Sequence, residues 1–179
     1  LIGIILYMEG LDCIGSDVRL LTALWELGVR GASLTWSRRN LLASGCCKAS
    51  ECYEIRGGLS PEGFDVVREM ERLGMFVDVS HLNDDGFENI RETAIRPFMA
   101  THSNCREVSF HYRNLTDTQM QILADQGGIA GLNGYVRLVS ETAEEEYPDE
   151  NSVYCLEKLC MHVEHMVEVM GPEHVGYGF

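Results

Sequence analysis

The sequence has few basic residues: 14 lysines and arginines stand against 28 aspartates and glutamates, which gives a formal net charge of −14 over 179 residues. Binding to a nucleic-acid backbone requires clustered basic side chains, so we expect no nucleic-acid partner. Much of the acidity is concentrated in residues 141–150, ETAEEEYPDE. This stretch is most simply a solvated loop.

Long apolar runs are also absent, and none is long enough to cross a bilayer. The first residues, LIGIILYM, have neither a basic flank nor a small-residue cleavage site, so they make a poor signal peptide. They also do not begin with methionine. We therefore expect residues 1–179 to be a segment of a longer protein, and we expect no membrane-spanning helix within these residues.

The seven cysteines include no C-x-x-C pair that would indicate a zinc ribbon, and their odd number does not fit a disulfide-stapled secreted module. Three of them, Cys46, Cys47 and Cys52, lie in an irregular, glycine-containing stretch. With 45% apolar residues the chain has ample material for a core. We expect reduced thiols and a cytoplasmic location.

No G-x-G-x-x-G or Walker pattern follows a candidate strand, which excludes the common phosphate-binding motifs. What the sequence does contain is an alternation of apolar runs and helical patterns. Several runs are apolar throughout, as is typical of strands covered on both faces. The six candidate strands are residues 2–8, 28–35, 75–80, 97–101, 127–133 and 174–179.

Helical patterns fill the segments between these runs. Ser16, Ser60 and Thr116 are suitable N-caps, and Gly28, Gly74 and Gly127 are suitable stops. The predicted helices are residues 17–27, 61–73, 84–93, 117–126 and 151–170. Strands that alternate with helices indicate parallel pairing through right-handed crossovers. Either an open doubly wound sheet or part of a (β/α)8 barrel fits, and the barrel needs two further strands.

Polar residues follow three of the candidate strands. Glu9 follows the first, His81 the third and His102 the fourth. Chemistry in parallel α/β folds lies at the carboxyl ends of strands, and a carboxylate with two imidazoles suits a divalent metal such as zinc. The alternative for each histidine is a loop residue that hydrogen-bonds to backbone.

Other polar residues have weaker claims to a function. Strand alternation turns Asp78 away from Val77 and Val79, which makes it a candidate to orient a ligand or to cap a neighbouring loop. Tyr135, after GLNG, is a candidate pocket residue. We interpret His111 as a surface-loop residue. The helix that carries Cys155, Cys160, His162 and His165 does not place four ligands on one face, so we interpret these side chains as packing residues.

At this point the sequence resembles the membrane dipeptidase (renal dipeptidase) family of zinc hydrolases along nearly its whole length. The resemblance rests on GVRGASLTW, GLSPEGFDVVREMERLGMFVDVSHLND, PFMATHSNCR, RNLTDTQ and EHVGYGF, which occur in the family's order. It implies an α/β fold in which residues 1–179 form a single, incomplete (β/α)8 barrel domain. About six of the eight parallel strands, with their crossover helices, would be present.

The same resemblance implies a zinc-dependent dipeptidase that uses a metal-bridging hydroxide. Glu9 matches the glutamate that bridges two zinc ions, His81 and His102 match the histidines of the second ion, and Arg113 matches an arginine associated with the substrate carboxylate. Trp36 stands where many relatives have a substrate-facing histidine. Tyr135 remains a candidate substrate residue.

Two parts of the family's site are absent from the sequence. No His-x-Asp pair for the first zinc occurs, and the acid/base aspartate is expected beyond Phe179. We therefore expect residues 1–179 alone to be inactive. The alternatives are a related two-metal amidohydrolase that acts on another amide or lactam, redirected by Trp36, and a non-catalytic metal-binding remnant. The expected partner is a dipeptide substrate, and a homo-oligomer is an open option.

Overall fold

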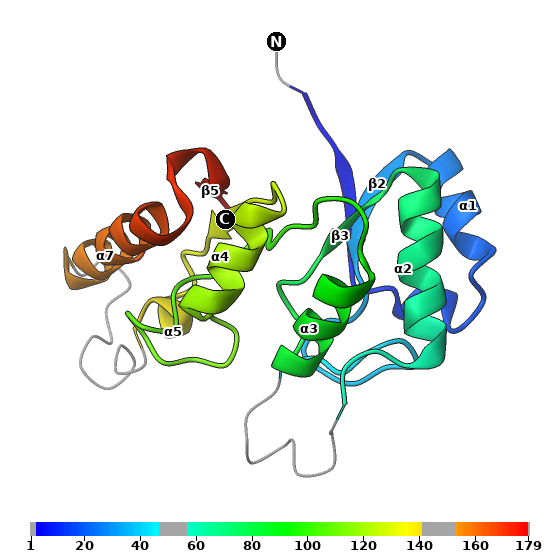
Figure 1. Ribbon diagram of the computed structural model, residues 1–179, viewed down its shortest axis with the longest axis horizontal. Coiled ribbons are helices and arrows are strands. Elements are labelled where there is room, and N and C mark those ends of the chain that lie inside the picture. Colours follow the sequence, from blue (N-terminus) through cyan, green and yellow to red (C-terminus); the bar gives the residue numbers. More distant parts are fainter. Residues whose placement is uncertain (1–2, 47–56, 141–152, 179) are drawn as a thin grey trace. The chain divides into compact units, whose positions relative to one another are not determined.

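The computed structural model describes residues 3–46, 57–140 and 153–178 (Figure 1). The chain divides into two compact units, residues 1–98 and 99–179. The predicted acidic loop at residues 141–150 lies outside the described residues, as do Cys47 and Cys52 and the side chain of Cys155. That residues 1–179 form a single domain stays a prediction.

The first unit contains a parallel sheet with the strand order β1-β2-β3. The register pairs Glu9 with Ser33 and Ser33 with Asp78, so the carboxyl ends of the three strands lie level with one another. Its elements are β1 (Leu6–Glu9), η1 (Asp12–Ile14), α1 (Leu20–Glu26), β2 (Val29–Ser33), α2 (Pro61–Leu73), β3 (Phe76–Asp78) and α3 (Asp84–Thr93).

Local signals set the bounds of α2, which lies between α1 and α3 and packs beside β3 (Figure 1). The Ser60 hydroxyl accepts a hydrogen bond from the Gly63 N–H, Pro61 occupies the first helical position, and Gly74 ends the helix with a left-handed φ of 77°. The apolar stripe of α2 faces the core, where Val66, Val67 and Met70 are fully buried.

The second unit contains a two-stranded parallel sheet, β4 (Ala130–Leu132) and β5 (Val175–Tyr177). Its helices are α4 (Asp117–Asp125), α5 (Val136–Val139) and α7 (Val153–Met170), with η2 (Pro172–His174) before β5. Thr116 and Gln119 form a reciprocal capping box at the start of α4, as the sequence pattern favours. None of the helices in the described part of the chain is long and apolar enough to span a membrane.

Both units are mixed α/β with parallel strand pairing, as predicted, but two local predictions are wrong. Residues 97–101 form no strand. Ala100 makes a single parallel bridge with Ala130, and Pro97, which has no N–H, cannot add to that ladder. Ser16 does not cap a helix, because α1 begins at Leu20 and the Asp17 carboxylate accepts the Arg19 N–H, which holds residues 17–20 in a turn.

Candidate metal site and substrate-binding residues

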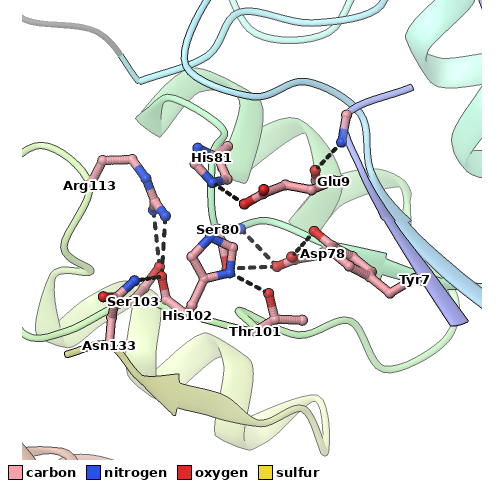
Figure 2. Close-up of polar contacts among 12 residues, drawn as sticks. Tyr7, Glu9, Asp78, Ser80, His81, Thr101, His102, Ser103, Arg113 and Asn133 are labelled. Carbon is pink, nitrogen blue, oxygen red and sulfur yellow. Dashed lines mark hydrogen bonds and ion pairs between the residues drawn. The ribbon is translucent and has the colours of Figure 1, made fainter. Parts of the chain in front are cut away.

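The first unit brings a carboxylate and an imidazole together. Glu9 is the last residue of β1, and His81 lies in the turn between β3 and α3. Glu9 Oε1 and His81 Nε2 are 2.8 Å apart (Figure 2). The His81 side chain is 7% exposed and the Glu9 side chain is 44% exposed, so solvent reaches the pair from the carboxylate side. One oxygen and one nitrogen placed in this way fit a divalent first-row cation.

Trp36 lies next to this pair. Its ring centroid is 5.8 Å from that of His81, and half of its surface, 52%, is exposed. The segment at Gly45 and Cys46 supports both residues: the Cys46 N–H donates to the His81 carbonyl at 2.8 Å, and a Cβ on Gly45 would lie 2.4 Å from the Trp36 carbonyl oxygen. Glycine is therefore required where this loop crosses the Trp36 backbone.

Asp78 caps the turn that carries His81, which was one of its two predicted roles. Its Oδ1 accepts hydrogen bonds from the Ser80 N–H at 2.9 Å and from the Ser80 hydroxyl at 2.7 Å. Its Oδ2 accepts from the Tyr7 hydroxyl at 2.5 Å (Figure 2). Burial, with the nearby Asp78 charge, raises the pKa of Tyr7 well above its ordinary value. Tyr7 was missed by the sequence analysis, although strand alternation places it on the same face as Glu9.

The second unit contains His102 and Arg113. The Arg113 side chain is almost fully covered, at 7% exposure for the residue, and donates to the Ser103 hydroxyl and to the His102 carbonyl, both at 3.2 Å (Figure 2). His102 Nδ1 lies 2.7 Å from the Thr101 hydroxyl. His102 follows the Ala100 bridge rather than a strand. Its predicted grouping with Glu9 and His81 on one metal stays a prediction.

Tyr135 and His111 flank this part of the second unit. Tyr135 is 55% exposed and its N–H donates to the Asn133 side-chain oxygen at 2.7 Å, while the Asn133 amide donates to the His102 carbonyl at 3.4 Å. His111 is half-buried and its Nδ1 accepts the Arg113 N–H at 3.1 Å. His111 is therefore partly a loop-supporting residue and not only a surface one.

The predicted packing role of the α7 side chains is confirmed for His162 and is wrong for Cys160, which is exposed to solvent. His162 is fully buried, with Nδ1 accepting the Cys105 N–H and Nε2 3.0 Å from the Val139 carbonyl. His165 Nε2 lies 2.7 Å from Asp117 Oδ1, and Cys160 is exposed. Burial raises the pKa of the Cys105 thiol to about 12, which makes that thiol a core group and not a nucleophile.

The sequence matches the family model described as Membrane dipeptidase (Peptidase family M19) over residues 1–179. Among curated proteins, Dipeptidase verJ of Clonostachys rogersoniana is 32% identical over 171 residues, which are 96% of this chain and 41% of that protein. A protein of Klebsiella pneumoniae known only by its position in the pqqA 5′ region is 30% identical, over 99% of this chain and 64% of its own length.

Among solved structures, a metallopeptidase from Rhodobacter sphaeroides, liganded with a phosphinate mimic of the dipeptide L-Ala-D-Ala, is 31% identical with a TM-score of 0.86. The similarity covers 97% of this chain and 48% of that one. The chain thus spans less than two thirds of the relatives it matches.

Proposed function

Because the chain belongs to the membrane dipeptidase family, peptidase family M19, we propose that the full-length protein is a zinc-dependent dipeptidase. The observation that carries the proposal is the 2.8 Å distance between Glu9 Oε1 and His81 Nε2. The pair lies at the carboxyl end of the parallel sheet of the first unit. Parallel α/β folds place their chemistry at this edge, and an oxygen and an imidazole nitrogen are zinc ligands.

Three residues of the chain would hold one zinc: Glu9, His81 and His102. Glu9 can also bridge to a second zinc, because a carboxylate has two oxygens. The support is the donor chemistry, together with an alignment to the Rhodobacter metallopeptidase that covers 97% of the chain, parts of both units included. Bound zinc would supply Lewis acidity that lowers the pKa of water and polarises the peptide carbonyl.

Arg113 would select the substrate by its free carboxylate. A guanidinium presents donors in a planar fork that matches a carboxylate, and burial strengthens such bonds. The bonds to the Ser103 hydroxyl and the His102 carbonyl fix the plane of the fork. Trp36, half exposed beside His81, and Tyr135, exposed after β4, would contact the substrate side chains. The Rhodobacter relative was solved with a dipeptide mimic, which agrees with this substrate class.

The proposed whole is a closed (β/α)8 barrel. Its support here is the parallel pairing of all named strands in the described residues, with three level carboxyl ends in the first unit. The His-x-Asp of the first metal and the acid/base aspartate would come from parts of the family fold that this chain does not span. Reduced thiols in a cytoplasmic compartment, and self-association, stay predictions.

A second candidate is a two-metal amidohydrolase for another amide or a lactam. Trp36 favours it, because a large, half-exposed ring 5.8 Å from that of His81 would narrow the space open to a substrate beside the proposed ligand. The third reading, a non-catalytic metal-binding remnant, keeps Glu9, His81 and His102 but has no second metal.

The test is a substrate panel. We expect the full-length protein to hydrolyse dipeptides, to lose that activity on dialysis against a chelator, and to regain it with zinc. Residues 1–179 alone should bind at most one zinc per chain and show no turnover, since no His-x-Asp occurs in them. Dipeptide hydrolysis that survives complete metal removal contradicts the proposal. Turnover of a lactam but of no dipeptide favours the amidohydrolase, and zinc binding without turnover favours the remnant.

A further inference from the structure

One face of the β1-β2-β3 sheet carries two rows of side chains. The strands pair in register, and alternate residues of each strand point to the same face. The row nearer the amino ends of the strands, here called the lower row, is Tyr7, Gly31 and Phe76. The row at their carboxyl ends, the upper row, is Glu9, Ser33 and Asp78. The upper row ends next to the turn of His81.

The lower row fixes the ring of Tyr7. The Tyr7 and Phe76 rings are stacked, with centroids 5.9 Å apart and planes 1° from parallel, although β2 separates their strands. Gly31 permits this contact, because a Cβ there would lie 2.1 Å from Phe76 Cζ. The Tyr7 hydroxyl is thereby directed at the upper row, where it meets Asp78.

Asp78 connects that hydroxyl to the turn of His81. Its carboxylate is fully buried, and a buried carboxylate is stable only when its oxygens accept hydrogen bonds. Tyr7 supplies one of these bonds to Oδ2, and the Ser80 N–H and hydroxyl supply two to Oδ1. The residue after Ser80 is His81, and the residue two before Glu9 is Tyr7.

We infer that Tyr7 and Asp78 are positioning residues that set the separation of the Glu9 and His81 metal ligands. Tyr7 ties the strand of Glu9 to Asp78, and Asp78 ties that strand to the backbone of the turn that presents His81. Neither side chain needs to touch the metal. The inference rests on the proposed function, since it assigns these residues to the proposed zinc site.

The test compares metal binding in the full-length protein with Tyr7→Phe, Asp78→Ala and Asp78→Asn. Tyr7→Phe keeps the ring stack and removes only the hydroxyl. We expect it and Asp78→Ala to weaken zinc binding about 10- to 100-fold, the effect typical of groups that orient metal ligands. They should also change the visible spectrum of the cobalt-loaded protein. Asp78→Asn should recover part of the affinity, because its side-chain oxygen can still accept the Ser80 N–H.

Glu71→Gln is the matched control. Glu71 is a buried carboxylate of α2 that accepts the Ile95 and Arg96 N–H groups, both at 2.9 Å. The Glu71→Gln substitution should lower the melting temperature of the metal-free protein without changing its zinc affinity or its cobalt spectrum. If Tyr7→Phe and Asp78→Ala behave like this control, the positioning role is wrong while the proposed function stands. If the wild-type protein binds no zinc, both fail.

Discussion

At the scale of single residues, Arg113 illustrates how burial and chemistry combine. Its side chain is held by a hydroxyl and a backbone carbonyl of the Thr101–Ser103 neighbourhood, so its guanidinium is ordered before any ligand arrives. An ordered fork loses little conformational entropy on binding a carboxylate. The identity of the side chain, and not only its charge, should therefore matter for recognition.

We predict that Arg113→Lys reduces kcat/KM for a dipeptide more than for the same dipeptide with a C-terminal amide. Lysine keeps the positive charge but loses the two-pronged contact, which corresponds to about 1–3 kcal/mol of charge-assisted bonding, or roughly 5- to 150-fold in kcat/KM. Steady-state kinetics on the two substrates measure the difference.

Arg106→Lys is the control for the loss of partly buried arginine hydrogen bonds. Arg106 lies in the same unit and donates to the Asn114 and Tyr112 carbonyls at 2.9 and 3.3 Å. The Arg106→Lys substitution should lower the stability of the protein without changing its preference for the dipeptide over the C-terminal amide. Equal losses on acid and amide in Arg113→Lys would mean that Arg113 does not read the carboxylate.

The sequence indicated some residues of the proposed site and not others for a physical reason. Glu9 and His81 are polar residues that follow apolar runs, and such a break in pattern is visible without a structure. Tyr7 sits inside an apolar run, where it is indistinguishable from a core aromatic. Its role depends on the Phe76 ring and on Asp78, which are about seventy residues away in the chain. Only the register of three strands brings them together.

At the scale of elements, the contact of the Phe76 ring with the backbone of Gly31 allows the packing on the β1-β2-β3 sheet to be tested. An alanine at position 31 would place its Cβ 2.1 Å from the Phe76 ring, so the ring would have to leave its stack with Tyr7. We predict that Gly31→Ala lowers the free energy of unfolding by about 1–3 kcal/mol, as overpacking typically does. Chemical denaturation of wild type and variant measures this change.

Two further variants isolate the clash. Gly176→Ala in β5 should be neutral or slightly stabilising, because its nearest neighbour would be Ile129 Cγ2 at an ordinary 3.6 Å. In a Phe76→Ala background, Gly31→Ala should no longer destabilise the protein, since the ring that it meets is gone. A destabilisation that is the same with and without Phe76 would assign the effect to the backbone.

Helices with complete local signals were predicted well, and a segment that depends on a distant partner was not. Ser60 and Gly74 bound α2, and Thr116 begins α4, because caps act within one turn. Residues 97–101 have the composition of a strand, yet a strand also needs a continuous ladder with a partner strand, and Ala100 makes only an isolated bridge with Ala130. The predicted start of α1 was wrong for a local reason, because hydrogen bonds between Asp17 and Arg19 hold these residues in a turn.

At the scale of the whole molecule, the alternation of apolar runs and helical patterns predicted the parallel α/β class and left the tertiary contacts of the second unit undetermined. His162 joins three segments of that unit: it is part of α7, it accepts the Cys105 N–H, and it faces the Val139 carbonyl. Because the Cys105 N–H can only donate, Nδ1 accepts and the proton lies on Nε2. The imidazole is therefore neutral in the folded protein, and burial lowers its pKa.

This lowered pKa predicts how stability depends on pH. Above the unfolded value of about 6.5, His162 is neutral in both states and contributes no pH dependence. As pH falls through that value, the unfolded chain binds a proton that the folded chain refuses. The free energy of unfolding then falls by at most about 1.4 kcal/mol per pH unit, until the lowered folded pKa is reached.

The net charge of −14 works in the opposite direction, since acidification relieves repulsion among the 28 acidic residues. The dependence of wild-type stability on pH therefore combines the protonation of His162 with the change in charge repulsion. A comparison with His162→Gln separates these two effects. Glutamine cannot titrate, so the stability advantage of wild type over His162→Gln should be largest near pH 7.5 and should shrink as the pH falls to 5.5. Urea denaturation followed by circular dichroism at each pH measures the difference. Parallel curves for the two proteins would mean that His162 is protonated as readily in the folded unit as in the unfolded chain.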